Sequence, residues 1–347
     1  MVNSESFWEF ALFSALKVFG VFAVLMIIVT YAVWVERKVS ASIQDRRGPN
    51  RVGLFGLLQP LADTIKALLK EDFTPGHVRK VYYWLAPAIV MIPSLMTMAI
   101  IPFGSQLGRQ KMVIADLNVG ILYTFGIVSL GVYGIVLAGY AANSKYPFLG
   151  GIRSSAQMIS YEIAMGMSVV PIFLIVGSLR LSDVVQYQAG GWSHWLIFSQ
   201  PLSFVIFVAA MFAETNRLPF DLPESEQELA GGYNVEYSSI KFALFFLAEY
   251  AAMSAASAMM VTLFFGGWTL PIAGLEQPAH TMFDGVLHIG IFLAKMLMVE
   301  FMIIWVRWMW PRFRYDQLMD LGWRRFIPFA LANIVVTAAV LWARTRG

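Results

Sequence analysis

Long apolar runs recur along the whole chain and constrain its fold more than any other feature. The hydrocarbon core of a bilayer is about 30 Å thick, and a helix needs about 20 residues to cross it. Hydrophobic residues make up 58% of the 347 residues and charged residues only 14%, whereas a globular domain averages about 25% charged. The sequence therefore predicts an all-α membrane protein with about eight transmembrane helices, at residues 10–35, 82–103, 119–142, 156–176, 195–213, 240–266, 286–306 and 326–343.

The charged residues between these runs predict the topology. Most of the 25 Lys and Arg fall in alternate connections, and an excess of positive residues marks the cytoplasmic side of a membrane protein. We therefore expect one membrane domain over 1–347, with both termini on the non-cytoplasmic side and cytoplasmic loops at approximately 36–81, 143–155, 214–239 and 307–325. The first run is too long for the core of a signal peptide, so we expect it to remain in the mature protein.

The first cytoplasmic loop contains a turn signal and a short amphipathic stretch. Because proline fixes φ and glycine and asparagine tolerate positive φ, Gly48-Pro49-Asn50 predicts a turn. From Pro60 onward, apolar and charged side chains recur with the period of a helix that is too short to span a bilayer. We expect this helix along the cytoplasmic interface, with Leu61, Ile65, Leu68 and Leu69 on its apolar face and Asp63, Lys66 and Lys70 on its polar face.

A long acidic loop between the fifth and sixth runs is the most informative stretch. Its carboxylates are Glu214, Asp221, Glu224, Glu226, Glu228 and Glu236. A solvated helix N-terminus also favours acidic residues, and for any single one of them this is the simpler interpretation. The cluster as a whole is bounded by apolar runs and accompanied by Arg217. Because acids held together against a low-dielectric wall share protons, we interpret the cluster as a proton-handling site.

Ionisable residues inside or at the ends of the apolar runs are the second signal. A charged side chain is costly in lipid, so such residues face a protein interior or a wetted cavity. Glu162, Glu214 and Glu249 are of this kind. A chain of intramembrane carboxylates is typical of a proton relay, and we expect these three residues to belong to one.

Two further charged groups also admit structural explanations. Lys295 and Glu300 occur in one run and could pair with each other, although a spacing of five is not ideal for one helix face. Glu36 and Arg37 end the first run, close to Asp63 if the amphipathic helix folds back. The ordinary alternative is that the long Arg37 side chain simply extends to the interface.

The chain lacks the residues that hold most redox centres. Cysteine is absent, which excludes thiolate-ligated iron–sulfur clusters, disulfides and catalytic thiols from this chain. The aromatic residues suit lipid-facing and interfacial positions and do not indicate nucleic-acid binding. The histidines are scattered without ligand spacing, so we expect no metal site formed by this protein alone; they are His77, His194, His280 and His288.

Several long motifs follow one another in order between about Glu36 and Trp323. They are Glu36-Arg37-Lys38, Gly48-Pro49-Asn50-Arg51-Val52-Gly53, Leu58-Gln59-Pro60-Leu61-Ala62-Asp63, Ser154-Ser155-Ala156-Gln157-Met158-Ile159-Ser160-Tyr161-Glu162, the acidic loop, and Pro311-Arg312-Phe313-Arg314-Tyr315-Asp316-Gln317-Leu318. In this order the motifs resemble the NuoH family, the H subunits of bacterial respiratory complex I. Several long motifs in one order are far more specific than any one of them alone.

The resemblance implies a membrane subunit of a proton-pumping NADH:quinone oxidoreductase that helps to form the quinone chamber. Residues implied to line or approach the quinone are Glu36, Arg37, Asp63, Arg217, Asp221, Glu224, Glu226 and Glu228. Residues implied to begin the proton route toward the antiporter-like subunits are Glu162, Glu214, Glu236 and Glu249. The chain alone is not expected to be catalytic, because the FMN and the iron–sulfur clusters belong to partner subunits.

The resemblance also implies the setting of the protein. We expect quinone as substrate, other complex I subunits and membrane lipid as partners, and the bacterial inner membrane as location. Both ubiquinone and menaquinone are compatible with the sequence. Departures from the commoner family pattern occur at Leu54, Thr64, Pro147 and Ala230, and none of them removes a charge.

Two other functions fit part of the pattern. The nearest is the homologous membrane subunit of an energy-converting hydrogenase or formate hydrogenlyase complex, which would use no quinone. The other is an ion-coupled secondary transporter. The long acidic loop and the absence of evident internal repeats count against a transporter.

Overall fold

The computed structural model describes residues 7–108, 110–222, 231–272 and 274–346. Almost all of the regular structure in these residues is helical. The α-helices are α1 (Phe7–Ile43), α2 (Gln59–Leu69), α3 (Lys80–Met96), α4 (Gly120–Ala141), α5 (Lys145–Val176), α6 (Leu181–Gln188), α7 (Leu196–Ser199), α8 (Pro201–Glu214), α10 (Ser239–Phe264), α11 (Met282–Met309), α12 (Tyr315–Asp320) and α13 (Ile327–Arg346).

Short elements connect these helices. Strands β1 (Gln106–Leu107) and β2 (Gln110–Lys111) form an antiparallel hairpin. Single turns of 3-10 helix are η1 (Leu54–Gly56), η2 (Thr97–Ile100), η3 (Trp192–His194) and η4 (Gly232–Asn234). A π-helical segment, η5 (Leu321–Phe326), joins α12 to α13 without a break in the helical backbone. The expected all-α class is confirmed.

Within the described residues, seven helices are long and apolar enough to cross a membrane. They correspond to seven of the eight expected runs. The remaining run, 195–213, is divided into α7 and the 14-residue helix α8. The division falls at Gln200, whose φ of −132° and ψ of 57° are not helical, and Pro201 then begins the new helix. Proline suits the first position of a helix because the amide hydrogen that it lacks has no partner there.

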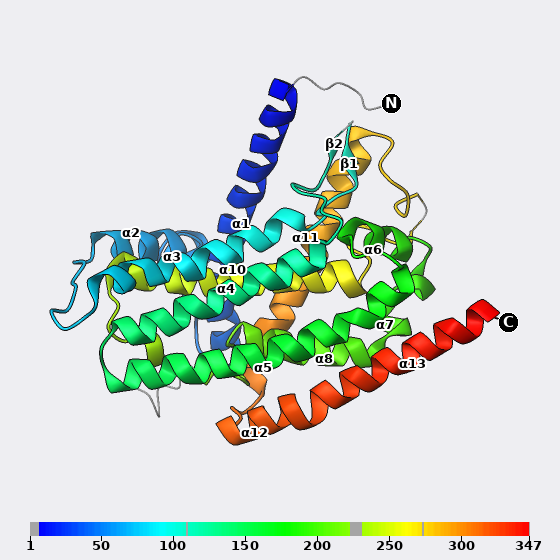
Figure 1. Ribbon diagram of the computed structural model, residues 1–347. Helices are drawn as coiled ribbons and strands as arrows, with labels where there is room; N and C mark the ends of the chain where they lie inside the picture. The colour runs from blue at the N-terminus through cyan, green and yellow to red at the C-terminus, as the bar shows by residue number, and fades with distance from the viewer. Residues whose placement is uncertain (1–6, 109, 223–230, 273, 347) are drawn as a thin grey trace.

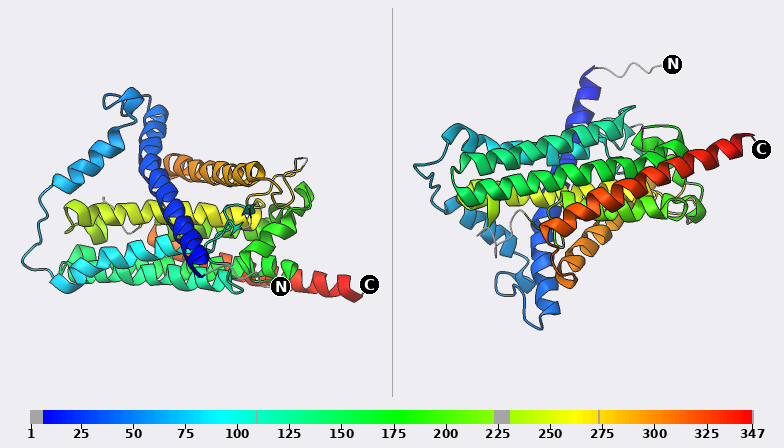
Figure 2. Two further views of the ribbon diagram at one scale, coloured as in Figure 1. Left: turned by 90° about the horizontal axis from the view of Figure 1, so that it is seen from above. Right: turned by 60° about the horizontal axis from the view of Figure 1, so that its bottom comes forward.

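The long helices form a layer that α1 crosses. Figure 1 shows α3, α4, α5 and α10 side by side, with α1 at a steep angle to them and α13 along the edge next to α5. The views in Figure 2 show the same crossing. Contacts join α3 to α4 and α10, α4 to α5, α5 to α8 and α13, and α10 to α1 and α11. The largest buried apolar cluster draws on α1, α5, α8, α10 and α11.

The expected amphipathic helix is present as α2. It begins at Gln59 with Pro60 in its first turn, and it contacts both α1 and α10. Its predicted apolar face is exposed in the isolated chain, as an interfacial helix requires. Helix α2 therefore folds back toward the inner end of α1, which brings the first loop close to the site described below.

The expected loop 143–155 is largely helical. Helix α5 starts at Lys145, about three turns before the predicted span, and its 32 residues extend about 48 Å. That length exceeds the ~30 Å bilayer core, so one helix passes from the membrane into the expected loop. The close approach of α4 and α5 explains this extension. A Cβ at Gly139 would lie 2.6 Å from the carbonyl oxygen of Pro147, so only glycine permits the contact.

Candidate functional site

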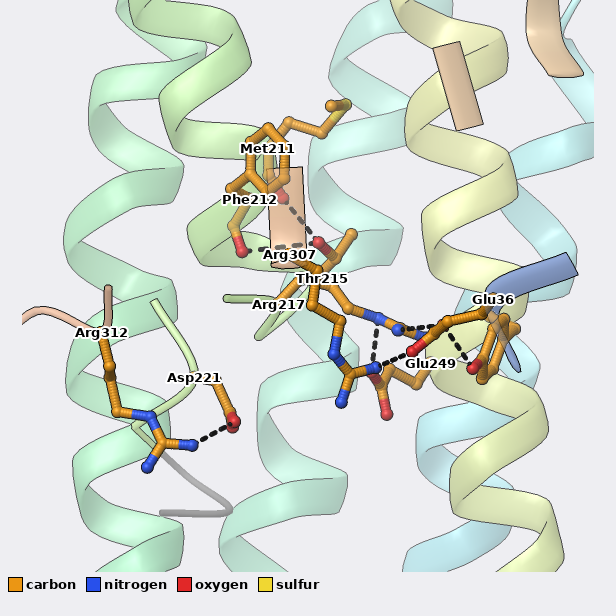
Figure 3. Close-up of polar contacts among 10 residues, drawn as sticks. Glu36, Met211, Phe212, Thr215, Arg217, Asp221, Glu249, Arg307 and Arg312 are labelled. Carbon is orange, nitrogen blue, oxygen red and sulfur yellow. Dashed lines mark hydrogen bonds and ion pairs between the residues drawn. The ribbon is translucent and has the colours of Figure 1, made fainter. Parts of the chain in front are cut away.

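A buried network of ion pairs joins α1, α10, α11 and the loop after α8 (Figure 3). Glu36 is only 7% exposed and Arg217 only 2%. The Arg217 guanidinium donates from Nη1 to Glu36 Oε2 at 2.8 Å and pairs through Nε with Glu249 Oε1 at 2.7 Å. Arg307 on α11 donates to the other oxygen of Glu36. Two arginines therefore balance two carboxylates where water is excluded.

Tyr250 completes this network. Its hydroxyl donates to Glu36 Oε2 at 2.6 Å, and its ring lies 4.2 Å from the Arg217 guanidinium carbon. Burial alone would lower the pKa of Arg217, but Glu249, Tyr250 and Glu36 raise it well above its ordinary value. Arg217 is therefore a permanent positive charge, and it fixes where negative charge can lie around it.

The loop that carries Arg217 is held by α5. Gln157 is fully buried, and its side-chain nitrogen donates to the carbonyl oxygens of Ala213 and Phe220, each at 2.7 Å. The backbone nitrogen of Arg217 donates to Phe212 at 3.1 Å. These bonds span both ends of the turn after α8. Gln157 belongs to one of the motifs on which the family resemblance rests, and the structure gives it this positioning role.

Asp221 forms a second buried pair near the first. Its Oδ2 accepts from Arg312 Nη2 at 2.8 Å, and its side chain is 9% exposed. Burial raises the pKa of Asp221 to about 6, although the positive charge of Arg312 beside it acts in the opposite direction. The carboxyl group therefore titrates close to neutral pH, unlike an ordinary aspartate.

The Arg37–Asp63 pair lies on the surface. Arg37 donates to Asp63 at 2.7 Å, with side-chain exposures of 49% and 32%. Gln59 donates to the other oxygen of Asp63 at 3.0 Å. Arg37 therefore pairs with α2 as the fold-back expectation requires, rather than only extending to the interface.

Two relay candidates, Glu214 and Glu249, line a cavity of about 110 Å³ between α3, α4, α5, α8 and α10. Both carboxylate oxygens of Glu214 are buried, and they have no hydrogen-bond partner in the part of the chain that the structure describes. Glu162 accepts a hydrogen bond from Ser129 and lies close enough to Glu214 for their charges to interact. With carboxylates in its otherwise mostly apolar lining, the cavity is large enough to hold several waters.

Glu236 lies apart from that cavity. Its carboxylate is 3.7 Å from His77 Nε2, and its backbone carbonyl accepts from the Tyr83 hydroxyl at 2.8 Å. The structure therefore brings Glu162, Glu214 and Glu249 together and places Glu236 at the rim, with its side chain 23% exposed. The predicted quinone-site residues Glu224, Glu226 and Glu228 lie outside the described residues.

The alternative pairing of Lys295 with Glu300 is wrong. Lys295 donates to the backbone oxygens of Phe265, Gly267 and Thr269, which follow the end of α10. Glu300 instead accepts from the Ser254 hydroxyl at 2.8 Å. The two side chains turn to different partners because a spacing of five places them on different faces of α11.

Sequence reasoning missed the roles of Arg307, Arg312 and Tyr250. The charge pattern marks the two arginines only as positive charge on the inner side, and nothing in it singles out Tyr250. One signal was available, since Arg307 is seven residues after Glu300 and therefore lies on the same face of α11. No cluster of three or more His, Asp or Glu among the described residues could hold a metal ion.

Curated proteins from several bacteria are similar to this chain over nearly its whole length. The first of two H subunits of the NADH-quinone oxidoreductase of Cytophaga hutchinsonii is 47% identical over 340 residues, covering 96% of this chain and 98% of that protein. "NADH-quinone oxidoreductase subunit 8" of Rhodothermus marinus is 47% identical over 332 residues, covering 94% and 96%. An H subunit of the NADH-quinone oxidoreductase of Geobacter metallireducens is 48% identical, with the same coverage.

The fold and the site define a multi-pass membrane protein that keeps a network of charged side chains beside a small internal cavity. Residues 16–338 match the NADH dehydrogenase family. Together with relatives of 45–48% identity, this match shows that the chain belongs to that family, among the H subunits of NADH-quinone oxidoreductases.

Proposed function

We propose that this chain is the membrane subunit of a proton-pumping NADH:quinone oxidoreductase that helps to form the quinone chamber and couples quinone reduction to proton translocation. One observation carries the proposal. The balanced network around Arg217 lies directly beside a cavity that contains Glu214, a carboxylate without a partner among the described residues. Glu249 belongs to both the network and the cavity lining, so charge in one region acts on the other.

In this proposal the electrons come from partner subunits that carry FMN and iron–sulfur clusters. Quinone takes two electrons and two protons to become quinol, so reduction changes the charge and proton demand beside this chain. Arg37 and Asp63 form the exposed entrance on α1 and α2, and the Asp221–Arg312 and Glu36–Arg217 pairs lie deeper. The acidic residues Glu224, Glu226 and Glu228 complete the proposed quinone site.

Proton movement is proposed to pass through the carboxylates beside the cavity. A rise in negative charge near Glu249 favours its protonated form. Glu214 and Glu162 interact electrostatically, so a proton gained by one changes the proton affinity of the other. Glu236 beside His77 is the proposed contact with the aqueous rim. The chain couples the reaction and does not itself hold the redox centre.

The proposed setting is the bacterial inner membrane, with both termini on the non-cytoplasmic side. The distribution of Lys and Arg supports this orientation. Other subunits of the same complex are the proposed partners, together with quinone and lipid. The rival hydrogenase subunit is not favoured, because the relatives carry names of NADH-quinone oxidoreductase subunits.

The test uses Glu214→Gln and Glu228→Gln in the assembled enzyme. We expect both variants to lose proton pumping more than they lose quinone reduction, because glutamine keeps the shape of the side chain but cannot exchange a proton. The matched control is Asp183→Asn on α6, which accepts from Ser178 and is not part of the cavity lining. Unchanged pumping and unchanged quinone reduction in both glutamine variants would refute the proposal.

A further inference from the structure

Glu300 on α11 is a third carboxylate beside the arginine network, and the proposed function does not use it. Its side chain is buried, with the residue 3% exposed. It accepts from Ser254 on α10 at 2.8 Å. Arg217 is close enough to act on it electrostatically but lies beyond ion-pair distance.

The charges around Glu300 do not balance if every group is ionised. The side chains that bear on it are Glu36 from α1, Arg217 from the loop after α8, Glu249 and Tyr250 from α10, and Arg307 from α11. Two arginines already pair with Glu36 and Glu249. A third negative charge would remain without a cation in a region that excludes water, and a buried carboxyl group in that position takes up a proton.

We infer that the network holds one exchangeable proton, which rests on Glu300 and moves between Glu300 and Glu249. This inference rests on the proposed function and extends it to α11. In the resting form Glu300 is neutral and Arg217 pairs with ionised Glu249. In the other form the O–H bond of Glu300 is broken, an O–H bond is present on Glu249, and Arg217 stabilises the negative charge on Glu300.

Both forms have the same net charge. Two positive and two negative groups are present in each, so the proton moves without placing an uncompensated charge in the membrane interior. Glu249 also lines the cavity, whereas Glu300 lies two turns along α11 from Arg307, about 10 Å farther from the inner end. Negative charge that arrives near the cavity therefore draws the proton toward Glu249.

Ser254 gives this proton a spectroscopic signature. Its hydroxyl donates to Glu300 Oε1, which is the carbonyl oxygen when the proton is on the other oxygen. A hydrogen bond to a carboxyl carbonyl lowers the stretching frequency of that carbonyl. Loss of the Ser254 hydroxyl is therefore expected to shift the infrared band of Glu300 upward without removing it.

The experiment records infrared difference spectra of the complete enzyme in lipid, between the oxidised and the quinone-reduced states. We expect the wild type to show a protonated-carboxyl band that E300Q loses and that S254A shifts upward. The control is S257A on α10, because the Ser257 hydroxyl donates to Met253 within its own helix. This control should leave the band in place.

The outcomes separate the inference from the proposed function. Proton pumping is measured in E214Q on the same preparations. If E214Q pumps normally, the proposed function fails and the inference fails with it. If E214Q loses pumping while E300Q keeps every carboxyl band of the wild type, or S254A leaves the band unshifted, only the inference is overturned.

Discussion

The two polar regions of this membrane protein differ in how their charges are balanced. Around Arg217, each carboxylate has an arginine or a hydroxyl partner, and the groups come from helices far apart in sequence. Around the cavity, Glu214 has no hydrogen-bond partner among the described residues, and Glu162 accepts from a neutral serine. Both regions lie within one layer of helices, and Glu249 belongs to both.

This difference suggests a division of labour. A carboxylate clamped by an arginine keeps its charge and its position, so it sets the local field and holds the helices in register. A buried carboxylate without a cation holds its charge weakly and exchanges protons more easily. The same residue type can therefore be structural in one region and responsive in the other.

The strongest test of the comparison is Arg217→Gln. We expect a loss of about 3–5 kcal/mol in the free energy of unfolding, because Glu36 and Glu249 would both stay buried with one cation fewer. Unfolding of the purified chain in detergent micelles measures this loss, and activity of the assembled enzyme should fall with it. The control is Arg180→Gln, which removes a partly exposed arginine whose partner Asp116 is 3.9 Å away. An Arg217 variant as stable as this control would contradict the clamp.

Asp221 lies between the two types, because it has an arginine partner and yet its pKa is raised from 3.8 to about 6. A group whose pKa is higher in the folded protein stabilises the fold at low pH and loses this contribution as pH rises through the folded value. The free energy of unfolding should therefore fall by on the order of 2 kcal/mol between about pH 4 and pH 6.5. Asp221→Asn should lack that component, and an identical pH slope in the variant would argue against it.

Glu162→Gln should act in the opposite direction to Arg217→Gln. Neutralising Glu162 removes its repulsion with Glu214, so we expect the free energy of unfolding to rise by on the order of 1 kcal/mol. The Ser129 hydroxyl can still donate to the glutamine amide oxygen. Glu214→Gln relieves the same repulsion and should shift stability in the same direction. A loss of stability in either variant would mean that the cavity carboxylates are clamped after all.

The sequence predicts the elements of this site better than its contacts. Apolar runs and the period of α2 give the helices, because lipid imposes the same local pattern everywhere. The partners of Glu36 are 181, 214 and 271 residues away in the chain, and no local pattern identifies them. The family resemblance supplied Arg217, whereas Arg307 and Tyr250 emerged only from the packing of α10 and α11 against α1.

Two boundary errors have the same physical origin. Pro201 lies inside an apolar run of spanning length, and hydropathy alone cannot indicate that the backbone bends before it. Pro147 and the nearby glycines are typical of a loop, yet they allow α5 to pack closely on α4. Residues that break a helix in water are tolerated where neighbouring helices pack tightly. Such positions are visible only when both partners are known.

The smallest expected effect is at the exposed pair of Arg37 and Asp63. Surface ion pairs contribute about 0–1 kcal/mol and weaken with salt, so Arg37→Gln and Asp63→Asn should each change the free energy of unfolding by no more than about 1 kcal/mol. A double-mutant cycle at low and high salt isolates the coupling between the two side chains. If their coupling proves large and insensitive to salt, the pair belongs with the clamped network around Arg217, and the proposed entrance is part of the rigid core rather than a flexible approach for the quinone.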